Sequence, residues 1–328
     1  MSKTTIVCPP NYMGYFMVAL LATLLALRPM YAALDDYNYI NYFSYSFQYS
    51  EFSVRFFMDE PLWLLYSVNL GKVLGSENAL RMTLFLSVWL FFAAFSNIKN
   101  KNFISLIIFF VICQEMAVQL YFNQIRQGLA LSLFLFVAVR FRMPIFAALL
   151  AATIHTSFLV VIAAQILVVL IKKRSWLYLA IFTVSVGVSI YIFSHLSIDD
   201  LGRRAYQYEN AGKLNVFYYT YLAIQYFPVI FWMSRLRKQV LMDEHYLQAI
   251  VYMMLAITIS LFSEAGGRLM YIVPVFWMWL ILENFQSKHA KLALTWLLCT
   301  LLFSSLYGTT KVESYDSWLG RWYLIFGI

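Results

Sequence analysis

The chain of 328 residues is 62% hydrophobic and only 12% charged. A water-soluble domain carries about 25% charged residues and seldom has more than half of its residues apolar, so this composition excludes an ordinary soluble domain. The formal net charge of +8 comes from Lys and Arg residues that lie largely between apolar runs. That distribution is typical of the cytoplasmic loops of a membrane protein, and it argues against nucleic-acid binding.

Long apolar runs predict an all-α, polytopic integral membrane protein of about eleven transmembrane helices. In chain order, the predicted spans cover residues 11–31, 79–95, 103–121, 126–139, two short helices within 144–171, then 176–193, 217–233, 246–262, 269–282 and 292–306. A further short helix over residues 61–74 is expected at the outer surface. The whole chain, 1–328, is predicted to form a single transmembrane domain.

The positions of the basic residues predict which loops lie outside. Residues 33–60 contain several Asp and Glu residues but only Arg55 as a basic residue, so this stretch is predicted to be an outer loop and the N-terminus to be cytoplasmic. Residues 195–215 and the tail 307–328 are likewise predicted to lie outside. Two short helices that meet near His155, in place of one long span, keep the basic cluster at 172–174 inside.

Arg126 opens an apolar helix and is the first candidate site residue. Backbone amides at a helix N-terminus together with a guanidinium group can bind a phosphate. The competing interpretation is an arginine that reaches the lipid headgroups. Asn123 and Gln127 belong with Glu115 and Gln119 to a set at four-residue steps, which would form one polar stripe if the helix were continuous.

His155 lies in apolar surroundings, where a polar side chain is costly and therefore a candidate for function. Its imidazole can act as a base near neutral pH. The alternative is a structural histidine that bonds a neighbouring carbonyl or Thr156.

The remaining candidates are charged residues predicted to lie outside. Arg268 follows two glycines, whose amides can approach an anion closely, although a helix ion pair with Glu264 is the competing account. Arg203 and Arg204 could bind phosphate or simply make a loop soluble. Acidic pairs at 35–36 and 199–200 could hold a divalent cation, but metal binding is the minority interpretation.

Several of these residues together resemble the EpsG/Wzy family of bacterial polysaccharide polymerases. The most specific part is the run NQIRQGLA, residues 123–130, followed by IHTS at 154–157. The stretch DYNY at 36–39, the pair Glu60–Pro61, and Arg268 ahead of Tyr271 are also similar to that family's pattern.

The resemblance implies a GT-C-like glycosyltransferase of the bacterial inner membrane. Such enzymes join oligosaccharide repeat units carried on undecaprenyl pyrophosphate at the periplasmic or outer face. Arg126 would neutralise the departing pyrophosphate, and His155 would be the candidate general base. The implied substrate-binding residues are Arg268, Arg203, Arg204, Gln127, Asn123, Tyr271 and Asp36. Because a lipid pyrophosphate is already activated, no cofactor is expected, and no metal.

Other functions fit the same residues. A transporter of lipid-linked sugars would use the arginines as an anion path, but it should carry polar residues through the depth of the bilayer. An O-antigen ligase would use similar arginine and histidine chemistry, and a membrane O-acyltransferase is a weaker alternative. The sequence leaves open whether the protein works alone or with a chain-length regulator.

Overall fold

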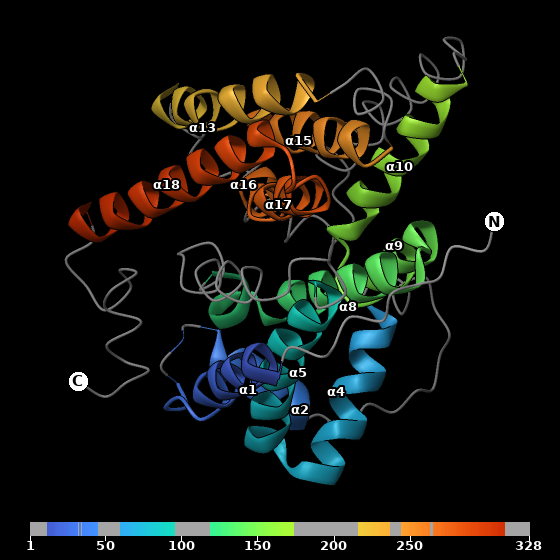
Figure 1. Ribbon diagram of the computed structural model, residues 1–328. Coiled ribbons are helices and arrows are strands. Elements are labelled where there is room, and N and C mark those ends of the chain that lie inside the picture. The colour runs from blue at the N-terminus through green and yellow to red at the C-terminus, as the bar shows by residue number, and fades with distance from the viewer. Residues whose placement is uncertain are drawn as a thin grey trace. The chain divides into compact units, whose positions relative to one another are not determined.

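The computed structural model describes residues 12–31, 33, 35–44, 60–95, 119–173, 216–236, 244–262 and 265–311. Within these ranges every regular element is a helix, in agreement with the all-α prediction (Figure 1). The chain divides into two compact units. The first contains Met1–Phe158 with Leu301–Ile328, and the second contains Leu159–Thr300.

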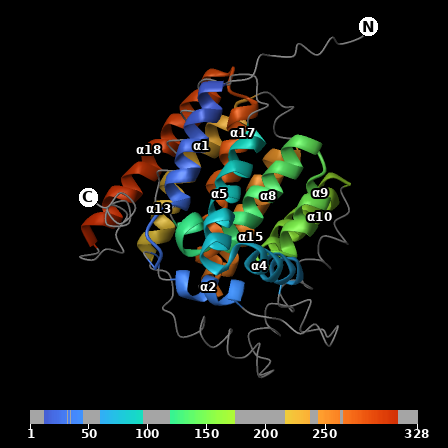
Figure 2. The same ribbon diagram turned by 90° about the horizontal axis from the view of Figure 1, so that it is seen from below.

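Helix α5 is the centre of the first unit. The helices of this unit are α1 (Tyr12–Ala26), α2 (Asp36–Ser44), α4 (Pro61–Leu74), α5 (Ser76–Phe95), the π-helical turn η1 (Gln119–Asn123), α8 (Ile125–Phe141) and α9 (Pro144–Ala152). Helix α5 packs against α1, α2, α4 and α8, and Figure 2 shows α1, α5 and α8 side by side. Its buried residues Leu80, Leu84, Val88, Phe91 and Phe95 recur at helical spacing, so one apolar face holds the unit together.

The second unit is built around α17. Its helices are α10 (Phe158–Lys172), α13 (Val216–Ser234), α15 (Glu244–Phe262), α16 (Ala265–Met270), α17 (Val273–Glu283) and α18 (Lys288–Lys311), with Phe158 and the residues of α18 from Leu301 on counted in the first unit. Every residue of α17 from Val273 to Leu282 is buried. Helix α15 packs on both α16 and α17, and the Tyr252 hydroxyl donates to the Leu269 carbonyl at 3.2 Å.

The predicted helix boundaries agree with the structure at two informative places. The short helix predicted over residues 61–74 is α4, Pro61–Leu74. The ambiguous segment 144–171 forms two short helices, α9 and α10, which meet around His155 as predicted. Residues 33–60 were expected to be loop, and part of them forms the nine-residue helix α2.

One predicted span is interrupted. Residues 269–282 were expected to form a single helix, but α16 ends at Met270 and α17 begins at Val273. Pro274 lies in the first turn of α17, and proline lacks the amide hydrogen that would continue the earlier helix. The described residues do not include most of the predicted span 103–121. They also do not include the predicted span 176–193, the predicted outer loop 195–215 or the tail beyond 311.

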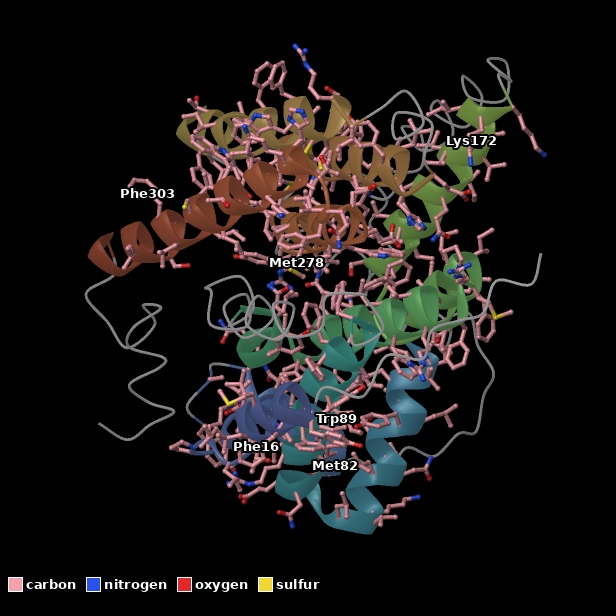
Figure 3. The ribbon with its side chains drawn as sticks, viewed as in Figure 1. Phe16, Met82, Trp89, Lys172, Met278 and Phe303 are labelled. Atoms are coloured by element: carbon pink, nitrogen blue, oxygen red, sulfur yellow. The ribbon has the colours of Figure 1, made fainter. Side chains whose placement is uncertain are left out.

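Two described helices are long and apolar enough to cross a membrane, namely α5 and residues Lys288–Leu306 of α18. Tyr15–Ala26 and α10 are apolar but shorter. Large apolar side chains also lie exposed on these helices, including Phe16 and Phe303, whereas Met278 is buried (Figure 3). Exposed apolar surface of this kind suits contact with lipid. The number of spans, about eleven, stays a prediction.

Candidate active site

Glu60 joins the two parts of the sequence that carry the strongest candidates. Its Oε2 accepts a hydrogen bond from Arg126 Nη1 at 2.5 Å. Its Oε1 accepts from the backbone N–H of Thr156 at 3.0 Å, and the Thr156 hydroxyl lies 3.5 Å away. A single carboxylate therefore holds the arginine that opens α8 and the segment that contains His155.

The start of α4 places Glu60 at this junction. Glu60 precedes Pro61, which begins the helix, and adopts the left-handed conformation with φ of 62°. The amides of Leu62 and Trp63 donate to the Thr153 carbonyl at 3.0 and 3.4 Å. These amides have no partner within α4, so they bond the segment that leads to His155. The hydrogen bonds hold that segment against the start of α4.

His155 forms a pair with Ser157. The Ser157 hydroxyl lies 2.8 Å from Nδ1 of His155, and the Ser157 backbone N–H donates to the same nitrogen at 3.2 Å. A backbone amide can only donate, so Nδ1 carries the lone pair, and the proton of the neutral ring is then assigned to Nε2. The basic nitrogen of His155 is therefore the one beside the Ser157 hydroxyl.

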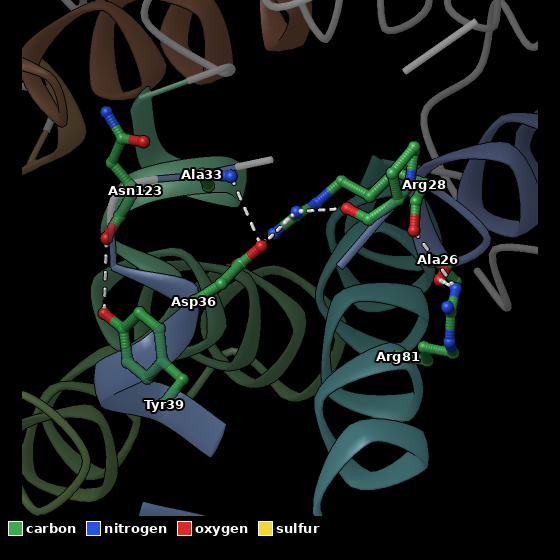
Figure 4. A network of polar contacts seen from close by, with 8 residues as sticks. Ala26, Arg28, Ala33, Asp36, Tyr39, Arg81 and Asn123 are labelled. Carbon is green, nitrogen blue, oxygen red and sulfur yellow. Dashed lines mark hydrogen bonds and ion pairs between the residues drawn. The ribbon is translucent and has the colours of Figure 1, made fainter. Parts of the chain in front are cut away.

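Helix α2 covers the other side of Arg126. The Arg126 guanidinium lies over the ring of Tyr42, 5.1 Å from its centre, in a cation–π arrangement. The Tyr39 hydroxyl donates to the Asn123 carbonyl at 3.4 Å, just before α8 begins (Figure 4). Burial raises the pKa of the Tyr39 phenol, which keeps this hydroxyl protonated and able to donate. Trp63 packs edge-on against Tyr39 and Tyr42 and joins α2 to α4.

Arg126 remains partly accessible in this setting. The Arg126 side chain is 22% exposed, whereas the Glu60 side chain is 3% exposed. Its Nε is buried and has no hydrogen-bond partner among the residues that the structure describes. Part of the Arg126 side chain therefore remains accessible, whereas Glu60 is buried.

Asp36 is fully buried in a bidentate ion pair with Arg28. Both Asp36 oxygens lie 2.5 Å from guanidinium nitrogens of Arg28, and Oδ2 also accepts from the Ala33 amide at 3.3 Å (Figure 4). Arg81 adds a hydrogen bond to the Ala26 carbonyl at 2.8 Å. This network ties the end of α1 to α2 and α5. In the structure, the Asp36 carboxylate neutralises the buried Arg28. Binding of substrate by Asp36 stays a prediction.

The polar stripe expected around Arg126 is interrupted. The π-helical turn η1 ends at Asn123, and Gln124, with φ of −113° and ψ of 53°, separates it from α8. Asn123 and Gln127 therefore belong to different elements, and Gln127 is fully buried within α8. Gly128 lies against η1, because a Cβ at this position would be 2.5 Å from the Leu120 carbonyl oxygen.

The other predicted substrate residues lie apart from this cluster in the sequence. Arg268 is exposed on α16 and Tyr271 follows that helix, both in the second unit. Arg203, Arg204 and Glu264 lie outside the described residues. No group of three His, Cys, Asp or Glu residues that could hold a metal ion occurs among the described residues.

Sequence reasoning did not single out three residues that the structure places beside Arg126 and His155. Glu60 contributed only to the family resemblance, and neither Tyr42 nor the amide of Thr156 was named as a site group. The available signal was an acidic residue directly before a proline that starts an apolar helix, since the positive end of a helix favours a negative charge at that position.

Comparison with known protein families agrees with the resemblance to the EpsG/Wzy family. No curated protein and no solved structure matches the chain. The model of the EpsG family matches residues 11–320, nearly the whole length. Together with the apolar helices, this match indicates a membrane protein. The chain belongs to the EpsG family.

Proposed function

We propose that the protein is a membrane glycosyltransferase that polymerises oligosaccharide repeat units linked to undecaprenyl pyrophosphate. Membership of the EpsG family supports a polymerase-like activity. The observation that carries the proposal is the carboxylate of Glu60, which joins Arg126 to the segment of His155. In this proposal, Arg126 is the cation for the leaving diphosphate and His155 is the base for the acceptor hydroxyl. Glu60 connects the two through its hydrogen bonds to Arg126 and Thr156.

Arg126 serves the leaving group. As the bond between the anomeric carbon and the pyrophosphate oxygen breaks, the electron pair stays on the pyrophosphate. A guanidinium next to that oxygen stabilises the developing negative charge more than it stabilises the substrate. The start of α8 adds the positive end of a helix close to the same side chain.

His155 serves the acceptor. The acceptor sugar hydroxyl gives its proton to the Ser157 hydroxyl as the acceptor oxygen attacks the anomeric carbon, and Ser157 passes its own proton to Nδ1 of His155. The short distance between the Ser157 hydroxyl and Nδ1, 2.8 Å, supports this transfer. The products are the extended glycan, undecaprenyl pyrophosphate with one more negative charge, and the proton on His155. Release of that proton to water restores the neutral ring, so atoms and charge balance without a cofactor.

The proposal includes further parts that depend on the membrane topology. The reaction takes place at the periplasmic face of the bacterial inner membrane, with the N-terminus in the cytoplasm. Arg268, Tyr271, Arg203 and Arg204 contact the substrate in addition to Arg126. A chain-length regulator as a partner is compatible with this activity.

The test is polymerisation of a synthetic undecaprenyl-pyrophosphate repeat unit by purified protein in lipid or detergent. We expect a ladder of glycans from the wild type and its loss in Arg126→Ala and His155→Ala. Matched controls are Arg235→Ala, an exposed arginine of the second unit, and His245→Ala, both of which should leave the ladder unchanged.

Three outcomes contradict the proposal in different ways. If the wild type makes no ladder but moves the lipid-linked sugar across liposomes, the protein is a transporter. If the single repeat unit is transferred once to a lipid A core and never to itself, it is a ligase. A ladder that survives both substitutions keeps the activity and rejects the site.

A further inference from the structure

Glu60 uses both carboxylate oxygens on groups of the proposed site. Oε2 pairs with Arg126, and Oε1 accepts from the Thr156 amide, one residue after His155. Arg126 and Thr156 lie 66 and 96 positions after Glu60 in the chain. The carboxylate is therefore a bridge between the cation and the segment of the base.

The burial of Glu60 separates its role from that of a catalytic base. Its side chain is 3% exposed, against 22% for Arg126. Burial therefore restricts direct contact between a substrate hydroxyl and this carboxylate.

The backbone around Glu60 indicates that its position is imposed by its surroundings. A glutamate at φ of 62° is in the left-handed region, which is unfavourable for a residue with a Cβ and persists only where the surroundings enforce it. The amides of Leu62 and Trp63 on the Thr153 carbonyl hold the neighbouring backbone in the matching place. This arrangement directs the carboxylate to Arg126 and Thr156 at once.

We propose that Glu60 is a positioning residue that aims the Arg126 guanidinium, together with the segment 153–157, at a lipid diphosphate. This inference rests on the proposed function and names the residue that prepares its anion site. Oε2 restrains one edge of the guanidinium and the Tyr42 ring restrains its face, so the orientation of the guanidinium is restrained. A preformed donor edge binds an anion more tightly than a mobile one, because less side-chain entropy is lost on binding.

The opposite role for Glu60 makes a different prediction. If its carboxylate merely occupied the place of the substrate phosphate, then removing its charge would free Arg126 and tighten diphosphate binding. A positioning residue does the reverse, because a glutamine directs an N–H or a weaker acceptor at Arg126 and lets the guanidinium turn away. The sign of the change in affinity therefore decides between the two roles.

The experiment measures binding of undecaprenyl pyrophosphate itself, without a sugar, to the purified full-length protein by isothermal titration in detergent. We expect Glu60→Gln to weaken binding about tenfold and Glu60→Asp, which keeps the charge on a shorter side chain, to weaken it less. Glu77→Gln, at an exposed position in the first turn of α5, is the matched charge control and should bind as the wild type does.

A double-variant cycle tests whether Glu60 acts through Arg126. Glu60→Gln should have little further effect in an Arg126→Gln background, whereas a merely structural role would lower affinity by the same factor in both backgrounds. Thermal unfolding in the same detergent checks that each variant is folded. If Glu60→Gln does not fold, Glu60→Asp decides, since it retains the buried charge.

Failure of this inference can be told apart from failure of the proposed function. Binding that weakens in Glu60→Gln while the wild type forms no polymer keeps the positioning role and rejects the polymerase. Polymerisation by the wild type with unchanged or tighter binding in Glu60→Gln rejects the positioning role. Absence of diphosphate binding by the wild type also overturns the inference.

Discussion

Glu60 Oε2 and Arg126 Nη1 lie 2.5 Å apart although the two residues are 66 positions apart in the chain. The pair is asymmetric, because the carboxylate is buried and the guanidinium is partly exposed. A buried charge must be paired, so this contact fixes where α8 begins relative to α4. The same pair leaves the Arg126 side chain partly accessible.

Arg126→Lys should fold but lose most of its activity. Lysine keeps the positive charge that Glu60 requires, so we expect the thermal stability to change by about 1 kcal/mol or less. It lacks the planar fork that can hold both Glu60 and a diphosphate oxygen, so polymerisation should fall by about 10²- to 10³-fold. The measurement is the initial rate of glycan ladder formation beside a thermal unfolding curve. A lysine variant with a wild-type rate would show that charge alone suffices.

Ser157→Ala should slow polymerisation without affecting the fold. The substitution removes the hydroxyl 2.8 Å from Nδ1 of His155 but retains the backbone N–H that donates to the same nitrogen. Because the proposed proton transfer passes through this hydroxyl, we expect kcat to fall about tenfold or more with little change in KM. Thr156→Ala is the control, since it loses only a side-chain contact of 3.5 Å to Glu60. Unchanged kcat in Ser157→Ala would mean that the acceptor reaches His155 directly.

Asp36→Ala should destabilise the protein severely. It would leave Arg28, which is fully buried, without the carboxylate that neutralises it. Breaking a buried pair in this way costs about 3–5 kcal/mol. The check is unfolding by heat or denaturant in detergent. Asp35→Ala is the control and should cost about 0.5 kcal/mol or less, since the Asp35 side chain accepts an exposed hydrogen bond from the Asn38 amide at 3.3 Å.

The double variant Arg28→Met with Asp36→Leu separates the structural role of Asp36 from substrate binding. Replacing a whole buried pair by apolar residues of similar size is often neutral, so much of the lost stability should return. If the double variant is stable and polymerises, Asp36 has a structural role. If it is stable but inactive, while Asp35→Ala remains active, the substrate contact predicted from the sequence gains support.

Gly128→Ala should destabilise the protein even though alanine is the better helix former. In an exposed helix the change would stabilise by about 1 kcal/mol. Here the new Cβ would lie 2.5 Å from the Leu120 carbonyl oxygen and 3.0 Å from the Tyr121 ring, so α8 and η1 must separate. We expect a net loss of about 1–3 kcal/mol, measured by thermal unfolding.

A second glycine gives the comparison for Gly128. A Cβ added at Gly75 would have open space around it, with nothing within 4 Å among the described residues, and only the φ of 75° opposes substitution. Gly75→Ala should therefore cost about 1 kcal/mol through the backbone alone. Activity that falls in Gly128→Ala but not in Gly75→Ala would tie the close approach of η1 to the placement of Arg126.

The sequence alone determined the helical class and many of the helix positions. Long apolar runs separated by basic clusters admit few structures other than helices, because the backbone groups must be satisfied within each segment. Local rules also located breaks, such as the helix that starts at Pro61 and the separation of α9 from α10 around His155. Arg126 and His155 were identifiable as candidates because ionisable groups are rare and costly among apolar residues.

Only the tertiary structure decided how those residues are held. The contact of Glu60 with both Arg126 and Thr156 depends on the packing of α4 against segments distant in sequence, and no local pattern encodes it. Burial likewise distinguished Asp36, which is paired inside the protein, from Arg126, whose side chain is partly exposed. The break of the polar stripe at Gln124 follows from the geometry that Gly128 permits between η1 and α8. Spacing along a chain specifies which side chains share a helix face, whereas long-range packing specifies which faces meet.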